Sequence, residues 1–374
     1  MKVISVNIPV MKGILKLGKV AGISIEVHWT FSLLLIWVII MELQREGDLQ
    51  SALFSVVLIL LLFLCVVLHE LGHALTARFF HISTKKITLL PIGGVASLEK
   101  IPEKPQQELL VSIAGPLVNV LIALVLVLFI PFQYYMGLDA VNLEAQLATP
   151  SLETLLFFLC MANIMLVVFN LIPAFPMDGG RVLRALLAIF MGRLKATEIA
   201  SGIGRAIAVL FLILGLFYNP FLVLIAFFIY MGAYGENQMV KQSIQLQGYQ
   251  VKDAMLTKIT TFGPENSLEE VIDAILAGTE KDFMVIENNR AVGILHNHNI
   301  IKNSKKTDVK VGVVMERSFQ TLEETGDLKK LLPLIVSNKQ RYFPVISKDK
   351  SLVGAIDMNN LSEFLLLKAN LITR

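Results

Sequence analysis

Long apolar runs fill the chain up to about Gly235, and they constrain its fold more than any other feature. An α-helix needs about 20 apolar residues to cross the hydrocarbon core of a bilayer. Within lipid, a helix also satisfies the backbone hydrogen bonds of its own segment. We therefore predict a multi-pass α-helical membrane domain with about six transmembrane helices, at Val27–Met41, Leu53–Phe80, Leu109–Phe132, Leu155–Ile172, Ile199–Phe217 and Pro220–Tyr234.

The charge balance separates the chain into two parts. Overall 55% of the residues are hydrophobic and 17% are charged, whereas soluble domains carry roughly a quarter charged residues. From about Asn237 the charge density becomes ordinary, which predicts a soluble α/β part after a membrane domain at residues 1–236. The net charge of +3 is small and spread out, so nucleic-acid binding is not expected. Cys65 and Cys160 lie inside apolar runs, which favours packing residues over a disulfide.

Basic residues in the loops predict the orientation of the helices. Four lysines precede the first run, and basic residues such as Arg78, Lys85, Arg181 and Arg193 follow the second and fourth runs. The loops after the first and third runs are acidic. Because basic loops stay on the cytoplasmic side, we predict a multi-pass protein of the cell membrane with both termini in the cytoplasm.

The strongest chemical signal is the sequence His69-Glu70-Leu71-Gly72-His73, which directly follows an apolar run. Residues i and i+4 share one face of a helix, so both imidazoles can reach a single metal ion. Glu70 lies between them, where it can take a proton from the attacking water. Ionisable groups at membrane depth are costly and mark functional sites by default. The alternative is a stripe of polar residues that meets lipid headgroups.

A third metal ligand must come from another segment, because a catalytic zinc takes three protein ligands and leaves one position for water. Asp178 is the best candidate, since it follows an apolar run that Pro173 and Pro176 must break. Broken backbone at membrane depth is tolerated where it is buried in protein or lines a water-filled cavity. A carboxylate in such a break is placed to bind the metal. The alternative is a turn residue in an Asp-Gly-Gly loop at the cytoplasmic mouth.

Three motifs together resemble those of the site-2 protease family of intramembrane zinc metalloproteases, over roughly Gly22–Gly192. They are HELGH at His69–His73, AGPLVN at Ala114–Asn119 and NLIPAFPMDGG at Asn170–Gly180. The resemblance implies an enzyme that hydrolyses peptide bonds within or near the transmembrane segments of membrane-protein substrates. It also implies one Zn²⁺ per chain, with the ligands His69, His73 and Asp178 and the catalytic residues Glu70 and Asn170.

The resemblance also suggests residues that contact substrate. Lys86–Leu98 is rich in β-branched residues and contains Gly93-Gly94, which predicts an extended strand or hairpin. A substrate must unwind before cleavage, and we expect this segment to receive it as an added strand. Asn119 is a further expected substrate contact. His28 matches an auxiliary histidine on the first helix of relatives, and an interface anchor beside Trp29 is an equally open role.

The second part of the chain contains an internal repeat. Met255 corresponds to Met315, and each copy reads as strand, helix, strand, strand, helix. The repeat resembles a pair of cystathionine-β-synthase (CBS) domains, with the first copy at residues 250–306 and the second at 307–370. Such pairs often bind adenine nucleotides, which implies regulation of the membrane domain. Asn299 and Asn360 stand where many nucleotide-binding members carry an aspartate for the ribose, so binding of ATP is expected to be weak in at least one cleft.

Two other classes of function compete with the peptidase. A CBS-regulated membrane transporter would leave HELGH unexplained and predicts inverted repeats among the helices, which the sequence does not show. A proteolytically silent membrane adaptor is at odds with the intact Glu70. The substrate and its cleavage site, the formation of a homodimer, the binding of a nucleotide and the role of His28 stay open.

Overall fold

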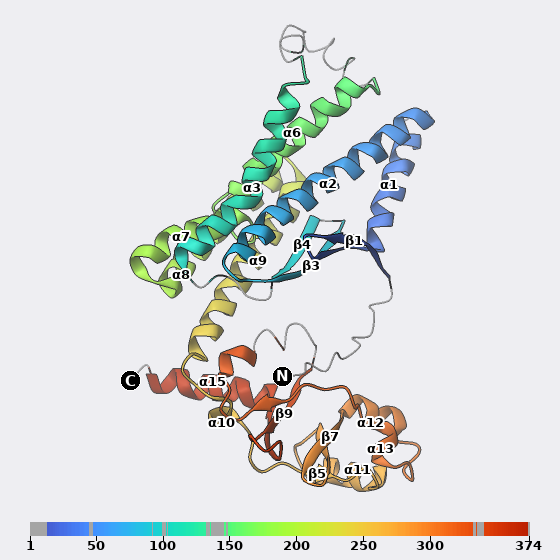
Figure 1. Ribbon diagram of the computed structural model, residues 1–374, viewed down its shortest axis with the longest axis vertical. Coiled ribbons are helices and arrows are strands. Elements are labelled where there is room, and N and C mark those ends of the chain that lie inside the picture. Colours follow the sequence, from blue (N-terminus) through green and yellow to red (C-terminus); the bar gives the residue numbers. More distant parts are fainter. Residues whose placement is uncertain are drawn as a thin grey trace. The chain divides into compact units, whose positions relative to one another are not determined.

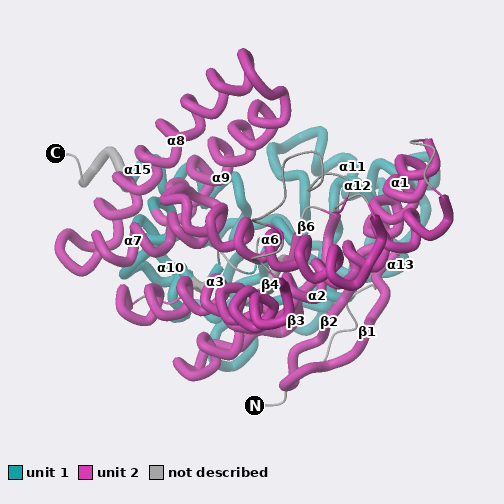
Figure 2. Tube along the Cα trace, turned by 90° about the horizontal axis from the view of Figure 1, so that it is seen from above, with its two compact units in different colours: residues 1–7, 241–374 teal, residues 8–240 magenta. Residues whose placement is uncertain are grey.

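The structure of the chain is a computed structural model that describes residues 13–44, 48–91, 93–98, 102, 104–131, 135, 146, 149–331, 334 and 340–372. The chain divides into two compact units (Figure 2). Residues 8–240 form the first, which we call the membrane unit, and residues 241–374 belong to the second, the C-terminal unit.

Helices build most of the membrane unit (Figure 1). Their bounds are α1 Thr30–Gln44, α2 Leu49–Phe79, α3 Pro105–Val127, α6 Leu152–Leu171, α7 Asp178–Met191, α8 Arg193–Phe217 and α9 Pro220–Gln245. In the described part of the chain, five of these are long and apolar enough to cross a membrane, and α1 is a shorter apolar helix. A helix corresponds to each of the six predicted spans, so the predicted fold class is confirmed, with α1 at 15 residues below the usual length of a span.

Helix α7 was not among the predicted helices. For its first residues, Asp178-Gly179-Gly180, the sequence left a break that holds a metal ligand and a loop as alternatives. In the structure they begin a helix because the two glycines pack against backbone. A Cβ at Gly179 would lie 2.3 Å from the carbonyl oxygen of Ile172, and one at Gly180 would lie 2.6 Å from Phe175 N. The start of α7 thus packs closely on the segment that joins it to α6, and only glycine fits there.

A four-stranded sheet completes the membrane unit. Its strands are β1 Ile14–Val20, β2 Ile23–His28, β3 Thr84–Leu90 and β4 Gly93–Leu98, in the order β1-β2-β3-β4. The β3–β4 pair is the predicted hairpin, whereas the β1–β2 hairpin was not predicted. Strand β2 ends at His28, so α1 begins later than the predicted span at Val27. Residues of β2, β3, α1 and α2 share one apolar core.

The C-terminal unit contains two copies of one α/β motif. The first copy has β5 Thr261–Phe262, α11 Leu268–Ala277, β6 Phe283–Glu287, β7 Arg290–Leu295 and α12 Asn297–Asn303. The second has β8 Leu322–Glu323, the 3-10 turn η1 Leu328–Lys330, β9 Tyr342–Ile346, β10 Leu352–Asp357 and α15 Met358–Ile372. In each copy the first strand is parallel and the third antiparallel to the middle strand. The predicted repeat is thus confirmed.

The two copies exchange the segments that precede them. Helix α10, Val251–Ala254, comes before the first copy in sequence, but Val251 lies in the core of the second copy together with Phe343. Helix α13, Val311–Val314, comes before the second copy, and Val311 lies in the core of the first copy with Phe283. The backbone follows the same exchange, because Leu256 pairs with β10 and Glu316 pairs with β7.

The swap of α10 and α13 between the copies predicts which strands a cavity in each core destabilises. Val251→Ala removes two methyl groups from a side chain that is 2% exposed, which lowers the local free energy of unfolding by roughly 2 kcal/mol. Hydrogen exchange of the whole protein should therefore speed up in β9 and β10. Val311→Ala is the matched variant and should speed up exchange in β6 and β7 instead. Val313→Ala, at an exposed position of α13, is the control and should change neither. Faster hydrogen exchange of β6 in Val251→Ala would show that α10 does not pack in the core of the second copy.

Candidate metal centre

Helix α2 positions the two histidines of the HELGH motif. The helix starts at the N-cap Asp48, whose side chain accepts a hydrogen bond from Ser51 N, and the apolar run that follows continues it without a break. His69 and His73 are one turn apart, so their rings lie on one face with Nε2 atoms 3.1 Å apart. Both are buried, at 6% and 5% exposure. The predicted convergence of the two imidazoles is present in the structure.

Asp178 completes a cluster of three. Its Oδ2 lies 3.2 Å from His69 Nε2 and 3.0 Å from His73 Nε2. Among the described residues, these three form the only group of at least three His, Cys, Asp or Glu whose ligand atoms lie close enough to hold a metal ion, all within 4.8 Å. The cluster combines a sequence motif on α2 with Asp178, which the sequence placed in a break after an apolar run and which is the first residue of α7 in the structure.

Two neighbouring groups fix the orientation of the imidazoles. His73 Nδ1 donates a hydrogen bond of 2.7 Å to the carbonyl oxygen of Val111, and His69 Nδ1 lies 2.5 Å from Asn119 Oδ1. A carbonyl oxygen only accepts, so the proton of each ring is on Nδ1 and the lone pair of Nε2 faces the cluster. This is the arrangement that histidine ligands of metals adopt. Two neutral imidazoles and one carboxylate form a donor set that suits catalytic zinc.

Asn119 belongs to a buried polar chain that runs away from the cluster. Its Nδ2 donates to Asn163 Oδ1 at 2.8 Å, and Asn163 Nδ2 donates to the carbonyl oxygen of Leu159. Both asparagines are fully buried. A buried amide in this position lies beside the imidazole of His69. The expected contact of Asn119 with substrate stays a prediction.

Gly115 of α3 lets the backbone approach the cluster closely. A Cβ at this position would lie 2.2 Å from His73 Nε2 and 2.7 Å from His69 Nε2. Gly72 of α2 makes the reciprocal approach, since its Cβ would lie 2.8 Å from the carbonyl oxygen of Ala114. Real Cβ atoms almost never come so near to other atoms. The space that a metal ion needs between the ligands is therefore kept open by the absence of a side chain at Gly115.

The other predicted site residues lie at different places around the cluster. Glu70 faces strand β4, because a Cβ at Gly94 would lie 3.0 Å from Glu70 Cγ. Gly93 begins β4 with a φ of +135°. Asn170 lies in the last turn of α6 and donates to the carbonyl oxygen of Leu166. His28 Nδ1 lies 2.8 Å from Thr30 Oγ1, and it is not a member of the cluster of ligand atoms.

Sequence reasoning missed several groups around the cluster. The carbonyl of Val111 and the bare backbone at Gly115 carry no signal in the side-chain pattern. A signal is present at Asn163, Glu108 and Arg184, because each is a polar residue in the membrane unit, where buried polar groups are costly. Their contacts follow from how α3, α6 and α7 pack, which the spacing along the chain does not reveal.

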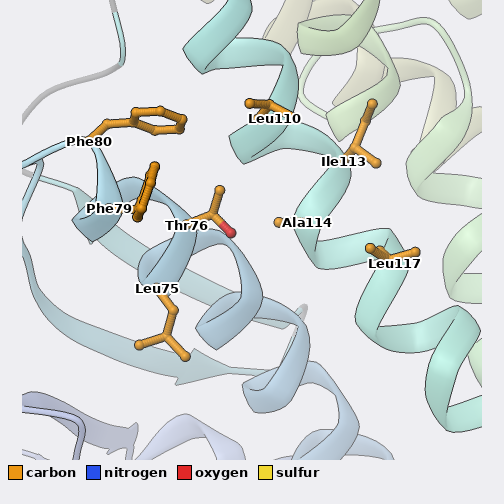
Figure 3. Close-up of a pocket in the computed structure, with 8 residues that line it drawn as sticks. All are labelled: Leu75, Thr76, Phe79, Phe80, Leu110, Ile113, Ala114 and Leu117. Carbon is orange, nitrogen blue, oxygen red and sulfur yellow. The ribbon is translucent and has the colours of Figure 1, made fainter.

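An open hollow of about 520 Å³ lies between the end of α2 and α3 (Figure 3). Its lining is apolar apart from Thr76, and consists of Leu75, Thr76, Phe79, Phe80, Leu110, Ile113, Ala114 and Leu117. No histidine or carboxylate lines it. The hollow therefore offers an apolar surface and no catalytic group.

The chain is similar to known proteins over both of its units. The model of peptidase family M50 matches residues 57–215, and the CBS domain model matches residues 251–306. A zinc metalloprotease of Methanocaldococcus jannaschii is 36% identical over 358 residues, which cover 96% of this chain and 98% of the relative. The chain belongs to peptidase family M50. It is an intramembrane zinc metalloprotease of the site-2 type, with a CBS pair at its C-terminal end.

Two further relatives belong to the same comparison. Stage IV sporulation protein FB of Bacillus subtilis is 32% identical to this chain over 131 residues, which cover 35% of this chain and 40% of the relative. A solved structure, a site-2 protease from Methanocaldococcus jannaschii, is 42% identical and covers 60% of this chain and 95% of that one, with a TM-score of 0.43.

The close approach at Gly115 gives a prediction for metal binding. Gly115→Ala would place a methyl group where the two Nε2 atoms meet, so zinc affinity should fall by roughly 100-fold or more. The zinc content of the purified protein measures this. Gly202→Ala, on α8, is the control because a Cβ there meets nothing within 4 Å. Full zinc occupancy in Gly115→Ala would show that the ion is bound elsewhere.

Proposed function

We propose that His69, His73 and Asp178 bind the zinc ion of this metalloprotease and that Glu70 is its general base. The observation that carries the proposal is the convergence of ligand atoms from three buried residues within 4.8 Å, two of them on α2, a helix long enough to cross a membrane. A site buried in this way acts on peptide bonds within or near transmembrane segments. Its substrates are therefore membrane proteins.

The residues of the chain divide the chemistry among them. When bound, zinc supplies Lewis-acid polarisation of the scissile carbonyl and makes water more acidic. Glu70 follows His69 directly and precedes His73 by three residues, so its carboxylate is close to the cluster without belonging to it. It accepts the proton of the attacking water and passes it to the leaving amine. Val111 and Asn119 hold the imidazoles so that both Nε2 atoms face Asp178, where they would hold the ion.

Strand β4 supports a model for how substrate reaches Glu70. β4 is at the end of the order β1-β2-β3-β4, so within the described sheet its outer edge is not paired. An extended segment of substrate can add to such an edge through main-chain hydrogen bonds. Because Gly94 lies against Glu70, a strand paired there brings its carbonyls to the base. Gly93 and Gly94 thus receive the unwound substrate, as their missing side chains leave room for its backbone.

The remaining site residues have separate proposed roles. Asn170 contacts the substrate or the developing oxyanion, and the partial exposure of its side chain supports this role. For Asn119 we propose orientation of His69 in place of contact with substrate, since the residue is fully buried. His28 lies next to Trp29, which is 53% exposed. This position supports an anchor at the membrane interface.

The role of Glu70 is tested by Glu70→Gln, which removes the base while keeping the shape of the side chain. Cleavage of a model transmembrane substrate should fall by at least 10²- to 10⁴-fold, and zinc content should stay at the wild-type level because Glu70 is not a ligand. Asp178→Ala is the comparison and should lose zinc as well as activity. Near-normal turnover in Glu70→Gln would refute the assignment and would favour a silent adaptor.

The orientation in the membrane follows from the loop charges. We propose that both termini and the segment around Lys85 are cytoplasmic, because Arg78 lies in the last turn of α2, Lys85 follows that helix, and Arg193 and Lys195 lie in the first turn of α8. Labelling of a cysteine introduced at Lys85 from outside the cell would contradict this orientation.

The C-terminal unit supports a regulatory role for the CBS pair, whose proposed domains are residues 250–306 and 307–370. Asn360 stands where many nucleotide-binding members carry the ribose-binding aspartate. Its side chain already makes a hydrogen bond within the protein, since Nδ2 donates to the carbonyl oxygen of Ala254 at 2.7 Å. A ribose in that cleft would have to compete with this bond. We therefore propose that an adenine nucleotide binds weakly, if at all, near Asn360. A homodimer stays a prediction, which the mass of the detergent-solubilised protein tests.

The nucleotide prediction is tested by isothermal titration of the whole protein in detergent with ATP and with AMP. Weak or absent ATP binding in at least one cleft is expected, because a neutral amide accepts hydrogen bonds from a ribose less strongly than a carboxylate does. Asn299→Asp should strengthen binding. Asn360→Asp should not, because a carboxylate cannot donate to Ala254 O. Tight ATP binding at two sites of the wild-type protein would contradict the prediction.

A further inference from the structure

A buried cluster of charges in the membrane unit takes no part in the proposed chemistry. Arg184 of α7 is completely buried. Its Nε donates to Glu108 Oε1 of α3 at 2.9 Å, and its Nη2 donates to the same oxygen. Its Nη1 donates to Glu236 of α9. The face of the guanidinium packs on Phe175, with 4.9 Å between Cζ and the ring centre. We call these four residues the Arg184 clamp.

The clamp joins the two halves of the zinc site. On one side, α7 carries Arg184 and begins with Asp178. On the other side, Glu108 lies one turn before Val111 on α3, the helix whose carbonyl and amide groups hold both histidines. The histidines of α2 are thus fixed to α3, and α3 is fixed to α7 through Arg184. The position of Asp178 relative to the imidazoles depends on this second link.

Burial makes the link rigid. A guanidinium presents several donors in one plane, so Arg184 holds carboxylates on two other helices in a fixed geometry that a lysine could not reproduce. In a site of low dielectric constant these charges have no water to replace their partners. Phe175 adds a contact to the segment between α6 and α7, three residues before Asp178. Helix α7 therefore has little freedom to slide along α3.

We infer that Arg184 is a positioning residue for Asp178, and that it acts through Glu108 to set the distance between the carboxylate and the histidine pair. The inference rests on the proposed role of Asp178 as a zinc ligand. Its consequence is specific to one arm of the clamp. The Glu108 arm reaches α3, whose Val111 and Asn119 contact the two histidines. The Glu236 arm reaches α9, which contributes none of the three ligands.

Two matched variants test the inference, Glu108→Gln and Glu236→Gln. Each replaces one carboxylate by an amide, and each leaves Arg184 with one carboxylate. Zinc affinity is measured on the whole protein in detergent by competition with a chelator, and the visible spectrum of the Co²⁺-substituted protein reports on the coordination geometry. Glu108→Gln should weaken zinc binding by roughly 10-fold and change the Co²⁺ spectrum. Glu236→Gln should keep the affinity and the spectrum of the wild type.

Equal effects of the two variants would overturn the inference, because a purely structural clamp makes no difference between its arms. If Glu108→Gln does not fold, Arg184→Lys replaces it, since a lysine keeps the charge but cannot bridge both carboxylates. Weaker zinc binding together with a changed Co²⁺ spectrum in Arg184→Lys supports the inference, and an unchanged spectrum or wild-type affinity refutes it.

Asp178→Ala separates this inference from the proposed function. Unchanged zinc affinity in Asp178→Ala would overturn the proposed zinc site itself. A loss of zinc in Asp178→Ala together with wild-type affinity in Glu108→Gln would overturn the positioning role alone.

Discussion

The meeting of one carboxylate with two imidazoles is the interaction on which the membrane unit depends. Asp178 brings a negative charge to His69 and His73 in buried surroundings. An isolated buried carboxylate is costly, and a metal ion with neutral imidazoles offsets that cost. The break between α6 and α7, the close contact of α2 with α3 and the buried charges of α7 all serve to hold these three side chains at one point.

Close contact between backbones takes the place of a hydrophobic driving force in this unit. In lipid, helices gain little from burying apolar side chains, so small residues at their interfaces matter more. Gly72 lies against Ala114, Gly179 against Leu171 and Gly232 against Pro176, each with no room for a Cβ. The same property that allows the helices to approach also leaves space for a metal ion beside Gly115.

The parts of the site that lie within one element were predictable from the sequence. His69, Glu70 and His73 have a fixed relation on any helix, and the prolines before Asp178 mark the break that holds it. The groups that orient the histidines depend on how α3 packs against α2, and a backbone carbonyl such as that of Val111 leaves no trace in a residue pattern. The β1–β2 hairpin was missed for a related reason: its apolar residues run directly into α1, so a single span seemed to begin at Val27.

The exchanged segments of the C-terminal unit affect the order in which the protein can fold during synthesis. The core of the first copy includes Val311 and Met315, so it cannot close when its own strands leave the ribosome. It must wait until the segment before the second copy has also emerged. The core of the second copy includes Leu246 and Val251, which are made earlier and stay without a partner until β9 and β10 follow. The first core can therefore close once Met315 has been made, whereas the second closes only after β9 and β10, and a chain cut between the two copies would contain no complete core.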